Sequence, residues 1–221
     1  MTVEDRRQQL IGVALDLFSR RPPDEVSLDE IAAAAGISRP LVYHYFPGKL
    51  SLYEAALRRA ADDLAGRFVE PPQGPLGERL LRVVSRFFDF VDEHGPGFAA
   101  LMRGGPGTGS STAGSVVDSV RHAAYQQLLV HLGTEEPPAR LELVVRSWIS
   151  LVESTALIWL EERRIPRREV ERQLVHAFGA LVAVGAAYDP AMAAMVRKAL
   201  AEEAPDGVFG ELVERMAEVC S

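Results

Sequence analysis

The side chains best suited to chemistry lie in residues 27–49, where hydroxyl, basic and aromatic groups alternate with apolar ones. Ser27 and Glu30 have the spacing of a capping box, in which each side chain accepts a hydrogen bond from the other residue's backbone N–H. Gly36 can adopt the positive φ that a tight reversal requires. Ser38 is a typical N-cap for a second helix. Two short helices joined by a tight turn form a helix-turn-helix, which predicts double-stranded DNA as the partner.

The pattern around this motif is more specific than a helix-turn-helix alone. An apolar first helix precedes it and a long helix follows it. The residues that carry the pattern are Ile11, Ala14, Leu15, Phe18, Ile31, Ala32, Ala35, Gly36, Ile37, Ser38, Tyr43, His44, Tyr45, Phe46, Lys49, Leu52 and Tyr53. In type and spacing they resemble the TetR family of bacterial transcriptional regulators (tetracycline-repressor-like). The resemblance covers about the first quarter of the chain, and the segment from Gly36 to Lys49 carries most of it.

Two positions depart from the family pattern. Family members usually carry glycine where the chain leaves the first helix, but this chain has Arg21-Pro22-Pro23-Asp24. Because two prolines fix φ, they can make the same turn stiffly and shift its geometry slightly. Many relatives have glycine at the position of Pro40. We expect this second departure to affect which DNA sequence is read rather than whether DNA is bound.

The resemblance implies which side chains contact DNA. Arg39, at the start of the second helix, would bond guanine O6 and N7, worth about 1–3 kcal/mol of discrimination, or else remain a solvated arginine. Pro40 and Leu41 would contact base edges or thymine methyl groups. Lys49 would bond a phosphate at the N-terminus of the long helix. The full set of predicted DNA-binding residues is Ser27, Ser38, Arg39, Pro40, Leu41, Tyr43, His44, Tyr45 and Lys49.

Some of these residues also have a simpler interpretation. Tyr43 and Tyr45 would bond phosphates through their hydroxyls, but Tyr45 could equally be a packing residue. His44 is expected to be a partly exposed helix residue rather than a pH switch. The neighbouring Val42 and Phe46 are expected to lie in the core.

Charge does not favour DNA binding by itself, because the net charge is −7. Residues 1–60 carry eight basic and eight acidic side chains, so the excess of acid lies in the rest of the chain. There it would limit nonspecific adhesion to DNA. The motif, and not the charge, therefore argues for DNA, and we expect binding with a strong salt dependence.

The composition predicts a globular protein of the cytoplasm. Hydrophobic residues make up 48% of the chain and charged residues 25%, which does not favour disorder. No apolar run approaches the ~18 residues of a membrane span, and no signal peptide precedes the first helix, so we expect no membrane partner. The single cysteine, Cys220, cannot form an internal disulfide and is expected to be a free thiol near a frayed end, which fits a reducing compartment.

Helical periodicity runs through the chain without convincing strand alternation or repeats, which predicts an all-α protein. The predicted domains are a three-helix helix-turn-helix DNA-binding domain at 1–50 and a larger helical ligand-binding and dimerisation domain at 51–221. A linking helix is expected over 48–68, and the proline-rich segment 71–75 breaks the pattern after it. The other expected helices are 3–20, 76–94, 98–103, 116–132, 138–164, 167–187, 190–203 and 207–219, with a flexible loop at 104–115.

The two helices over residues 141–187 are apolar around much of their circumference. A pair too apolar to face water is best explained by burial on two sides, one of them against a second subunit. The alternative is a pair of core helices with no partner. The resemblance implies a four-helix bundle between two protomers, with the predicted interface residues Leu157, Leu174, Phe178, Ala180, Leu181, Ala183 and Val184.

The resemblance also implies a pocket for an unknown small-molecule effector within the C-terminal helices. Filling it would shift the spacing of the two DNA-reading heads. The candidates are aromatic and polar residues on apolar helices: Phe88, His94, Phe98, Met102, Arg103, Tyr125, Trp148, Glu153 and Trp159. Each could instead be an ordinary core or surface residue. Glu153 is the most informative, because a carboxylate among apolar neighbours is costly to bury unpaired; the alternative is that it pairs across the dimer.

No pattern indicates an enzyme. The five histidines show no metal-ligand spacing with acids or cysteine, and no nucleophile elbow or His-Glu-x-x-His motif is present. The glycine-rich segment 104–115 lacks the Gly-Lys-Ser/Thr ending of a phosphate-binding loop. We therefore expect no catalytic residues, metal or cofactor. The predicted function is a ligand-responsive regulator, in the first instance a dimeric repressor released from a palindromic operator by a small molecule. The alternative is a regulator controlled by a protein partner, or a DNA-architectural factor with no small ligand.

Overall fold

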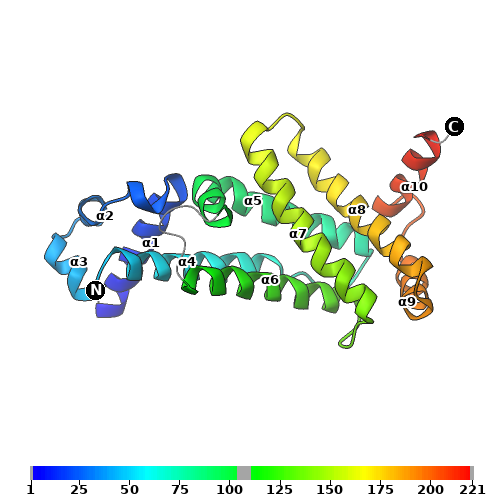
Figure 1. Ribbon diagram of the computed structural model, residues 1–221, viewed down its shortest axis with the longest axis horizontal. Coiled ribbons are helices and arrows are strands. Elements are labelled where there is room, and N and C mark those ends of the chain that lie inside the picture. The colour runs from blue at the N-terminus through cyan, green and yellow to red at the C-terminus, as the bar shows by residue number, and fades with distance from the viewer. Residues whose placement is uncertain (1, 104–110, 220–221) are drawn as a thin grey trace. The chain divides into compact units, whose positions relative to one another are not determined.

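The computed structural model describes residues 2–103 and 111–219, and within these ranges the chain forms helices and no strand. The prediction of an all-α protein is confirmed for this part of the chain. The elements in order are α1 Val3–Arg20, the 3₁₀ helix η1 Pro23–Glu25, α2 Leu28–Ala34, α3 Arg39–Tyr45, α4 Lys49–Arg67, α5 Leu76–Met102, α6 Ser111–Leu132, α7 Ala139–Glu162, α8 Arg167–Ala187, α9 Pro190–Leu200 and α10 Val208–Val219 (Figure 1).

The chain packs into two compact units that do not follow chain order. The first unit comprises residues 1–66 and 90–120, and the second comprises residues 67–89 and 121–221. Helix α5 therefore contributes its first half to the second unit and its second half to the first. The division of the chain at residue 50 stays a prediction, because these units describe packing within one chain.

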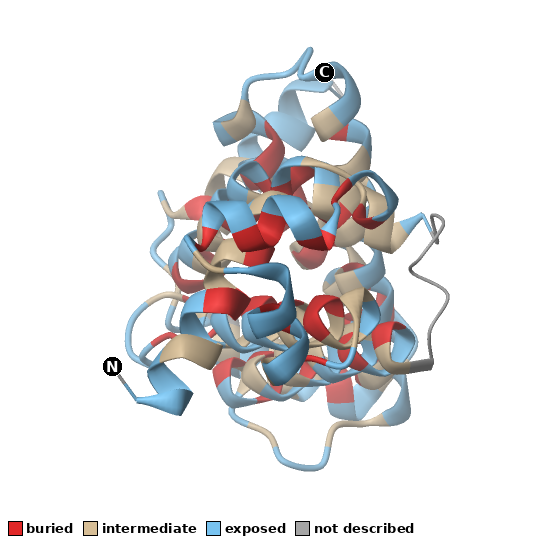
Figure 2. Cartoon of the chain, turned by 90° about the vertical axis from the view of Figure 1, so that its left-hand side faces the viewer, coloured by how far each residue is buried: buried red, intermediate tan, exposed pale blue. Residues whose placement is uncertain are grey.

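The core of the first unit is built by α1, α2, α3 and the start of α4. Helix α1 begins with a capping box, in which the Asp5 N–H donates to Thr2 Oγ1 at 3.0 Å and the Thr2 N–H donates to Asp5 Oδ2 at 2.7 Å. The buried residues of this core come from all four helices, and Figure 2 colours buried residues red. They are Leu10, Ile11, Ala14, Phe18, Val26, Leu28, Ile31, Ala32, Ala35, Val42, Phe46, Leu52, Tyr53 and Ala56. This shared core fixes the three helices of the motif relative to one another.

Helix α5 bends at His94, whose backbone angles (φ −119°, ψ 16°) are not helical. Pro96 follows shortly after and lacks the N–H that would continue the helical hydrogen bonding. The two helices expected on either side of this point therefore form one kinked helix. At Gly97 a Cβ would lie 2.4 Å from the carbonyl oxygen of Phe18, so only glycine lets α5 approach the end of α1 so closely.

Helix α6 begins earlier than expected. The sequence predicted a loop to residue 115, but residues 111–115 are helical. Ala113 and Val116 are buried, at 1% and 8% exposed, so tertiary packing supports a first turn that is poor in apolar residues. The rest of the expected loop, residues 104–110, lies outside the described residues, as does Cys220.

In the second unit, α7 packs against α8. The Trp148 indole N–H donates to the Leu174 carbonyl at 2.7 Å, and the rings of Trp148 and Phe178 meet edge-on with centroids 5.0 Å apart. Among the described residues, α7 is the one helix long and apolar enough to cross a membrane by length and composition. The sequence expectation that no segment has this composition is therefore wrong. A single such helix is only a weak indication of a membrane span, since core helices pass the same test.

Candidate DNA-binding surface and effector cleft

The first helix of the motif, α2, is fixed at its start by the predicted capping box. The Glu30 N–H donates to Ser27 Oγ at 3.1 Å, and the Ser27 N–H donates to Glu30 Oε2 at 2.9 Å. Arg21 donates a further hydrogen bond to Glu30 at 2.9 Å. The Ser27 backbone, and after it Arg21, hold the pKa of Glu30 below its ordinary value. The reciprocal cap fixes the residue at which α2 begins. It therefore also fixes where the turn after α2 lies.

The turn between α2 and α3 depends on Gly36, whose φ is +66°. No atom lies within 4 Å of the point where a Cβ would sit, so glycine is required for its backbone conformation and not for lack of space. Ser38 is the N-cap residue of α3, but its side chain makes no capping hydrogen bond. The predicted capping by the Ser38 hydroxyl is therefore wrong, and this residue is exposed next to the start of α3.

Helix α3 buries one side and exposes the other. Val42 within the helix and Phe46 at its end are 0% and 2% exposed, in agreement with their predicted place in the core. Leu41 and Tyr43 lie on the other side and are 37% and 44% exposed. The remaining predicted DNA-binding residues of the helix that are exposed are Arg39, Pro40 and His44. Apolar and hydrogen-bonding groups on one exposed helix face are suited to base edges and thymine methyl groups.

Arg39 is positioned by two neighbours. Its Nη1 donates to Asp29 Oδ2 at 3.0 Å, and its Nη2 donates to the Tyr43 hydroxyl at 3.4 Å. The Tyr43 hydroxyl, and after it the charge of Asp29, raise the pKa of Arg39. The Arg39 side chain is 53% exposed, so water screens its ion pair with Asp29 and a DNA base can replace that partner. Sequence reasoning missed Asp29, although its place in the first turn of α2 sets it across the turn from α3.

The predicted phosphate contacts at the end of α3 have partners within the chain. The Lys49 ammonium donates to the Pro23 carbonyl at 3.0 Å, so a phosphate would share or replace this bond. Tyr45 is half-buried and packs against the core of the first unit, and its ring meets the His44 ring edge-on at 5.2 Å. Tyr45 therefore has a packing role, whatever its hydroxyl contacts.

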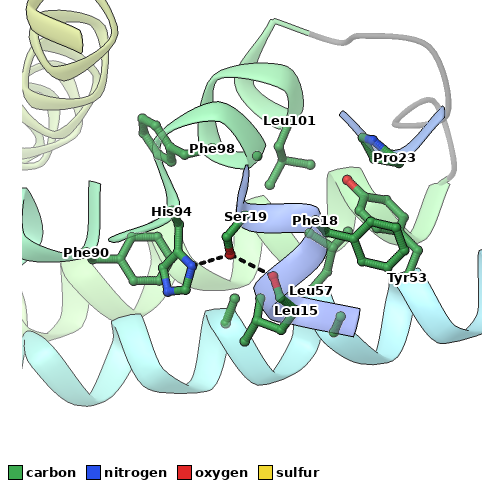
Figure 3. Close-up of a pocket in the computed structure, with 13 residues that line it drawn as sticks. Leu15, Phe18, Ser19, Pro23, Tyr53, Leu57, Phe90, His94, Phe98 and Leu101 are labelled. Atoms are coloured by element: carbon green, nitrogen blue, oxygen red, sulfur yellow. Dashed lines mark hydrogen bonds between the residues drawn. The ribbon is translucent and has the colours of Figure 1, made fainter. Parts of the chain in front are cut away.

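An apolar cleft lies within the first unit, between α1, α4 and the second half of α5 (Figure 3). The enclosed space is about 60 Å³ and one side of it opens to solvent, so the cleft is smaller than the ~300–1,000 Å³ of typical small-molecule sites. Its lining includes two of the predicted ligand-binding residues, His94 and Phe98. The other lining residues are Leu15, Phe18, Ser19, Pro23, Tyr53, Ala56, Leu57, Ala60, Phe90, Gly97 and Leu101.

The polar groups of this cleft are few. Ser19 Oγ lies 2.5 Å from His94 Nδ1, and burial raises the pKa of the Tyr53 hydroxyl to about 12. Sequence reasoning missed Ser19 and Tyr53, because Ser19 lies on the first helix of the predicted DNA-binding domain and Tyr53 on the linking helix that follows it. The lining residues come from α1, α4 and the kink of α5, which lie far apart in the sequence. No sequence spacing could therefore predict this cleft.

Comparisons with known protein families and solved structures agree with the observed arrangement of a helix-turn-helix followed by further helices. A family model described as "Bacterial regulatory proteins, tetR family" matches residues 10–56, and one described as "Tetracyclin repressor-like, C-terminal domain" matches residues 76–181. A solved TetR-family transcriptional regulator from Streptomyces coelicolor is 74% identical, with a TM-score of 0.96, over 100% of this chain and 99% of that one. The chain belongs to the TetR family. It is therefore a DNA-binding transcriptional regulator with a helix-turn-helix and a larger C-terminal helical region, and not an enzyme.

Two curated relatives of this TetR regulator are more distant. The transcriptional activator FasR of Mycolicibacterium smegmatis is 29% identical over 185 residues, which is 80% of this chain and 84% of that protein. The transcriptional regulator EthR of Mycobacterium tuberculosis is 33% identical over 95 residues, which is 41% of this chain and 44% of that protein. Both names agree with a regulator that binds DNA through a helix-turn-helix.

The other predicted ligand-binding residues of the TetR regulator do not line the cleft. Phe88 is fully buried against Trp159, whose indole N–H donates to the Ile165 carbonyl at 3.0 Å. Trp148 bonds Leu174, as described above. Met102 and Arg103 lie at the end of α5, half-buried and exposed respectively.

Glu153 and Tyr125 have charged partners within the second unit. Arg121 donates to both oxygens of the Glu153 carboxylate, from Nη2 at 2.8 Å and from Nε at 3.0 and 3.1 Å, and the Glu153 side chain is 15% exposed. This ion pair offsets the cost of burying the Glu153 carboxylate. The sequence alone had not identified the partner of Glu153. Arg146 lies over the Tyr125 ring at 4.8 Å. These residues therefore have a structural role within one subunit.

The predicted interface residues divide into three groups by their exposure. Leu174 and Phe178 are 3% and 1% exposed and belong to the core of the second unit. Leu157 and Leu181 are half-buried. The exposed group on α8 consists of Ala180, Ala183 and Val184. The predicted interface set left out the exposed α7 residues Leu143, Leu151 and Ile158, because the apolar pattern of α7 is continuous around the helix.

Proposed function

We propose that this TetR regulator is a dimeric repressor that binds a near-palindromic DNA operator and is released from it by a small molecule. The observation that carries this proposal is the exposed face of α3, where Arg39, Leu41 and Tyr43 lie opposite the buried Val42. In a helix-turn-helix the second helix enters the major groove with its N-terminal residues nearest the bases. Arg39 lies at that end of α3 and carries a fork of donors suited to guanine.

The exposed apolar face of α7 and α8 supports a dimer. We name the interface patch Leu143, Leu151, Ile158, Ala180, Ala183 and Val184, and these residues are exposed in the single chain. Ile158 and Val184 are 63% and 61% exposed, and apolar side chains gathered in one patch favour a contact with another protein surface. Because one patch must serve both copies, a two-fold symmetric dimer is the simplest arrangement. Such a dimer presents two α3 helices to half-sites about 34–36 Å apart or a multiple of this spacing.

The effector is proposed to bind in the cleft of the first unit. The cleft wall includes α1, which supports the motif, and α4, which begins shortly after α3. A ligand that favours one arrangement of these helices weakens DNA binding by its difference in affinity for the two arrangements. The lining is apolar except for the hydroxyls of Ser19 and Tyr53 and the imidazole of His94. This lining favours an apolar ligand with one hydrogen-bonding group.

Activation of transcription is a second candidate, favoured by one observation. The relative FasR, which matches 80% of this chain, is named a transcriptional activator. The same α3 surface and dimer serve either sense of regulation, because the position of the operator relative to the promoter decides whether RNA polymerase is blocked or recruited.

The proposal is tested by transcription in vitro. The templates are genomic DNA fragments that the protein binds and that are recovered with it. A repressor lowers the amount of transcript from these fragments as protein is added, and saturating effector restores it. A rise in transcript with added protein establishes the activator. Fragments recovered equally by the protein and by a helix-turn-helix variant, Gly36→Val, would contradict DNA reading by this motif.

A further inference from the structure

The cation at the start of α3 is paired with an acid of the helix before it. Asp29 lies in the first turn of α2, and its Oδ2 accepts a hydrogen bond from Arg39 Nη1 at 3.0 Å. The side chains of Asp29 and Arg39 are 65% and 53% exposed, so DNA can reach both. In a helix-turn-helix the N-terminal residues of the second helix lie nearest the bases. An acid in contact with Arg39 therefore lies close to DNA whenever Arg39 does.

Tyr43 contacts the same guanidinium from within α3. Arg39 Nη2 donates to the Tyr43 hydroxyl at 3.4 Å, and the guanidinium carbon of Arg39 lies 5.7 Å from the centre of the Tyr43 ring. Arg39 is thus held between one acceptor from α2 and one from its own helix. Both of its terminal nitrogens, which a bidentate contact with guanine would use, already have a partner in the free protein.

The charge of Asp29 distinguishes the two kinds of acceptor that DNA offers to Arg39. The O6 and N7 atoms of guanine belong to a neutral base, which a carboxylate repels little. The guanidinium has more N–H donors than guanine uses, so Asp29 can stay beside an Arg39 that contacts guanine. A phosphate is an anion, so Asp29 repels it and competes with it for the guanidinium. The pair with Asp29 therefore disfavours phosphate contacts of Arg39 more than base contacts.

We propose that Asp29 is a specificity-determining residue, which directs Arg39 toward a base edge and away from phosphates. It acts on base preference through Arg39, and on affinity for any DNA through its own charge. The inference rests on the proposed function, because it takes α3 as the helix that reads DNA. An Arg39 without this neighbour would bind phosphates of any sequence, which raises nonspecific affinity and lowers the preference for the operator.

Affinity for a duplex of random sequence, measured at several salt concentrations, tests the effect of Asp29 on phosphates. Asp29→Asn keeps the shape of the side chain and removes its charge. We expect it to raise this affinity about two- to fivefold and to make the salt slope steeper by about one. Asp16→Asn is the matched control, because Asp16 forms an exposed pair with Arg20 at 2.8 Å on α1 in the same unit. The control should bind as the original protein does.

Selection of bound duplexes from a random pool tests the effect of Asp29 on base preference. Asp29→Asn should lower the preference at the base pair that Arg39 reads by about two- to fivefold, while circular dichroism shows an unchanged helical content. The same substitution in an Arg39→Ala background should leave the base preference unaltered, since Asp29 acts on bases through Arg39.

Two results would overturn the proposal. One is an affinity for the random duplex that is the same in Asp29→Asn and in the original protein. The other is a change in base preference that is equal with and without Arg39. No enriched sequence with the original protein would instead contradict the proposed function, and the random-duplex measurement would still decide the effect of Asp29 on phosphates.

Discussion

At the scale of single residues, we propose that two cations have different roles in DNA binding. Arg39 lies at the start of α3 with an exchangeable partner, Asp29, whereas Lys49 lies beyond the end of α3 with a backbone partner. A phosphate contact carries no sequence information, so losing Lys49 should weaken binding to every DNA sequence alike. We predict that Lys49→Ala lowers affinity for specific and random duplexes together and makes the salt slope shallower by about one.

Binding isotherms at several salt concentrations measure this slope. Lys198→Ala provides the matched control, because Lys198 is the other lysine of the chain and lies exposed on α9. An unchanged slope in Lys49→Ala would remove this residue from the phosphate contacts.

Two buried histidines make stability depend on pH. Burial lowers the pKa of His131 and of His176, and Arg79 lowers that of His131 further. The unfolded chain binds these protons near pH 6.5, whereas the folded chain binds them only at lower pH. The stability present above pH 6.5 is therefore lost as the pH falls toward the folded pKa values. We predict a lower melting temperature at pH 5.5 than at pH 7.5.

Thermal unfolding of variants assigns this dependence to the two histidines. His131→Leu and His176→Leu should each reduce the difference in melting temperature between pH 5.5 and pH 7.5. The exposed His122→Leu should leave it unchanged. The carboxyl groups with lowered pKa, such as Glu211, titrate below this window and do not obscure the result. A pH dependence that survives both buried substitutions would contradict the assignment.

Local features of the DNA-binding surface could be predicted from sequence, and long-range pairs could not. The capping box of Ser27 and Glu30 and the positive φ of Gly36 involve residues within one turn, so their spacing is sufficient. The bond between Ser19 and His94 joins residues far apart in the chain, and no periodicity indicates it. Ser38 shows a limit even at short range, because a favourable N-cap residue does not guarantee the capping bond.

At the scale of elements, the approach of α5 to α1 is fixed by one glycine. A Cβ at Gly97 would contact the Phe18 carbonyl oxygen at 2.4 Å, and a backbone atom cannot move aside as a side chain can. We predict that Gly97→Ala lowers the free energy of unfolding by about 1–3 kcal/mol. Urea denaturation measures the change.

Gly66→Ala is the matched control for this substitution. Gly66 also lies within a helix, α4, but no atom lies within 4 Å of its Cβ position. The control should therefore gain about 0.5–1 kcal/mol from the better helix propensity of alanine. A Gly97→Ala protein as stable as the Gly66→Ala protein would show that α5 is free to move away from α1.

The positions of most helices follow from apolar periodicity, and the exceptions have physical causes. The periodic pattern of α8 is long and ends at a clear boundary, and its observed range agrees with the expected one. Residues 111–115 have the small, polar composition of a loop, yet burial of Ala113 stabilises a helical turn. Tertiary packing overrode local propensity there, and a single sequence does not contain that information.

At the scale of the whole molecule, the interface patch should determine the oligomeric state. A glutamate at Ala183 would place a charge in an apolar interface with no partner, which is costly to desolvate. We predict that Ala183→Glu and Ala180→Glu give monomers with poor operator affinity, because a monomer gains the contacts of one half-site only. Light scattering after gel filtration measures the mass, and Ala194→Glu, at an exposed alanine of α9, is the control. A dimeric Ala183→Glu protein would place the interface elsewhere.

The apolar pattern indicated that much of the surface of α7 and α8 is buried. It could not distinguish the residues of the core from those of a dimer interface. Leu174 and Phe178 belong to the same pattern as Val184, yet they face the core of the second unit while Val184 is exposed. The orientation of each helix about its axis decides this division, and that orientation depends on packing between helices.

Selection of bound DNA from a random pool of duplexes tests the central claim most directly. The original protein, Arg39→Ala and the control Arg168→Ala, at an exposed arginine of α8, are compared at low salt. The account predicts a near-palindromic consensus for the original protein and for Arg168→Ala. Arg39→Ala should lose preference at one position in each half-site, by an amount equivalent to about 1–3 kcal/mol. No enriched sequence, or an Arg39→Ala consensus identical to that of the original protein, would contradict DNA reading by this face of α3.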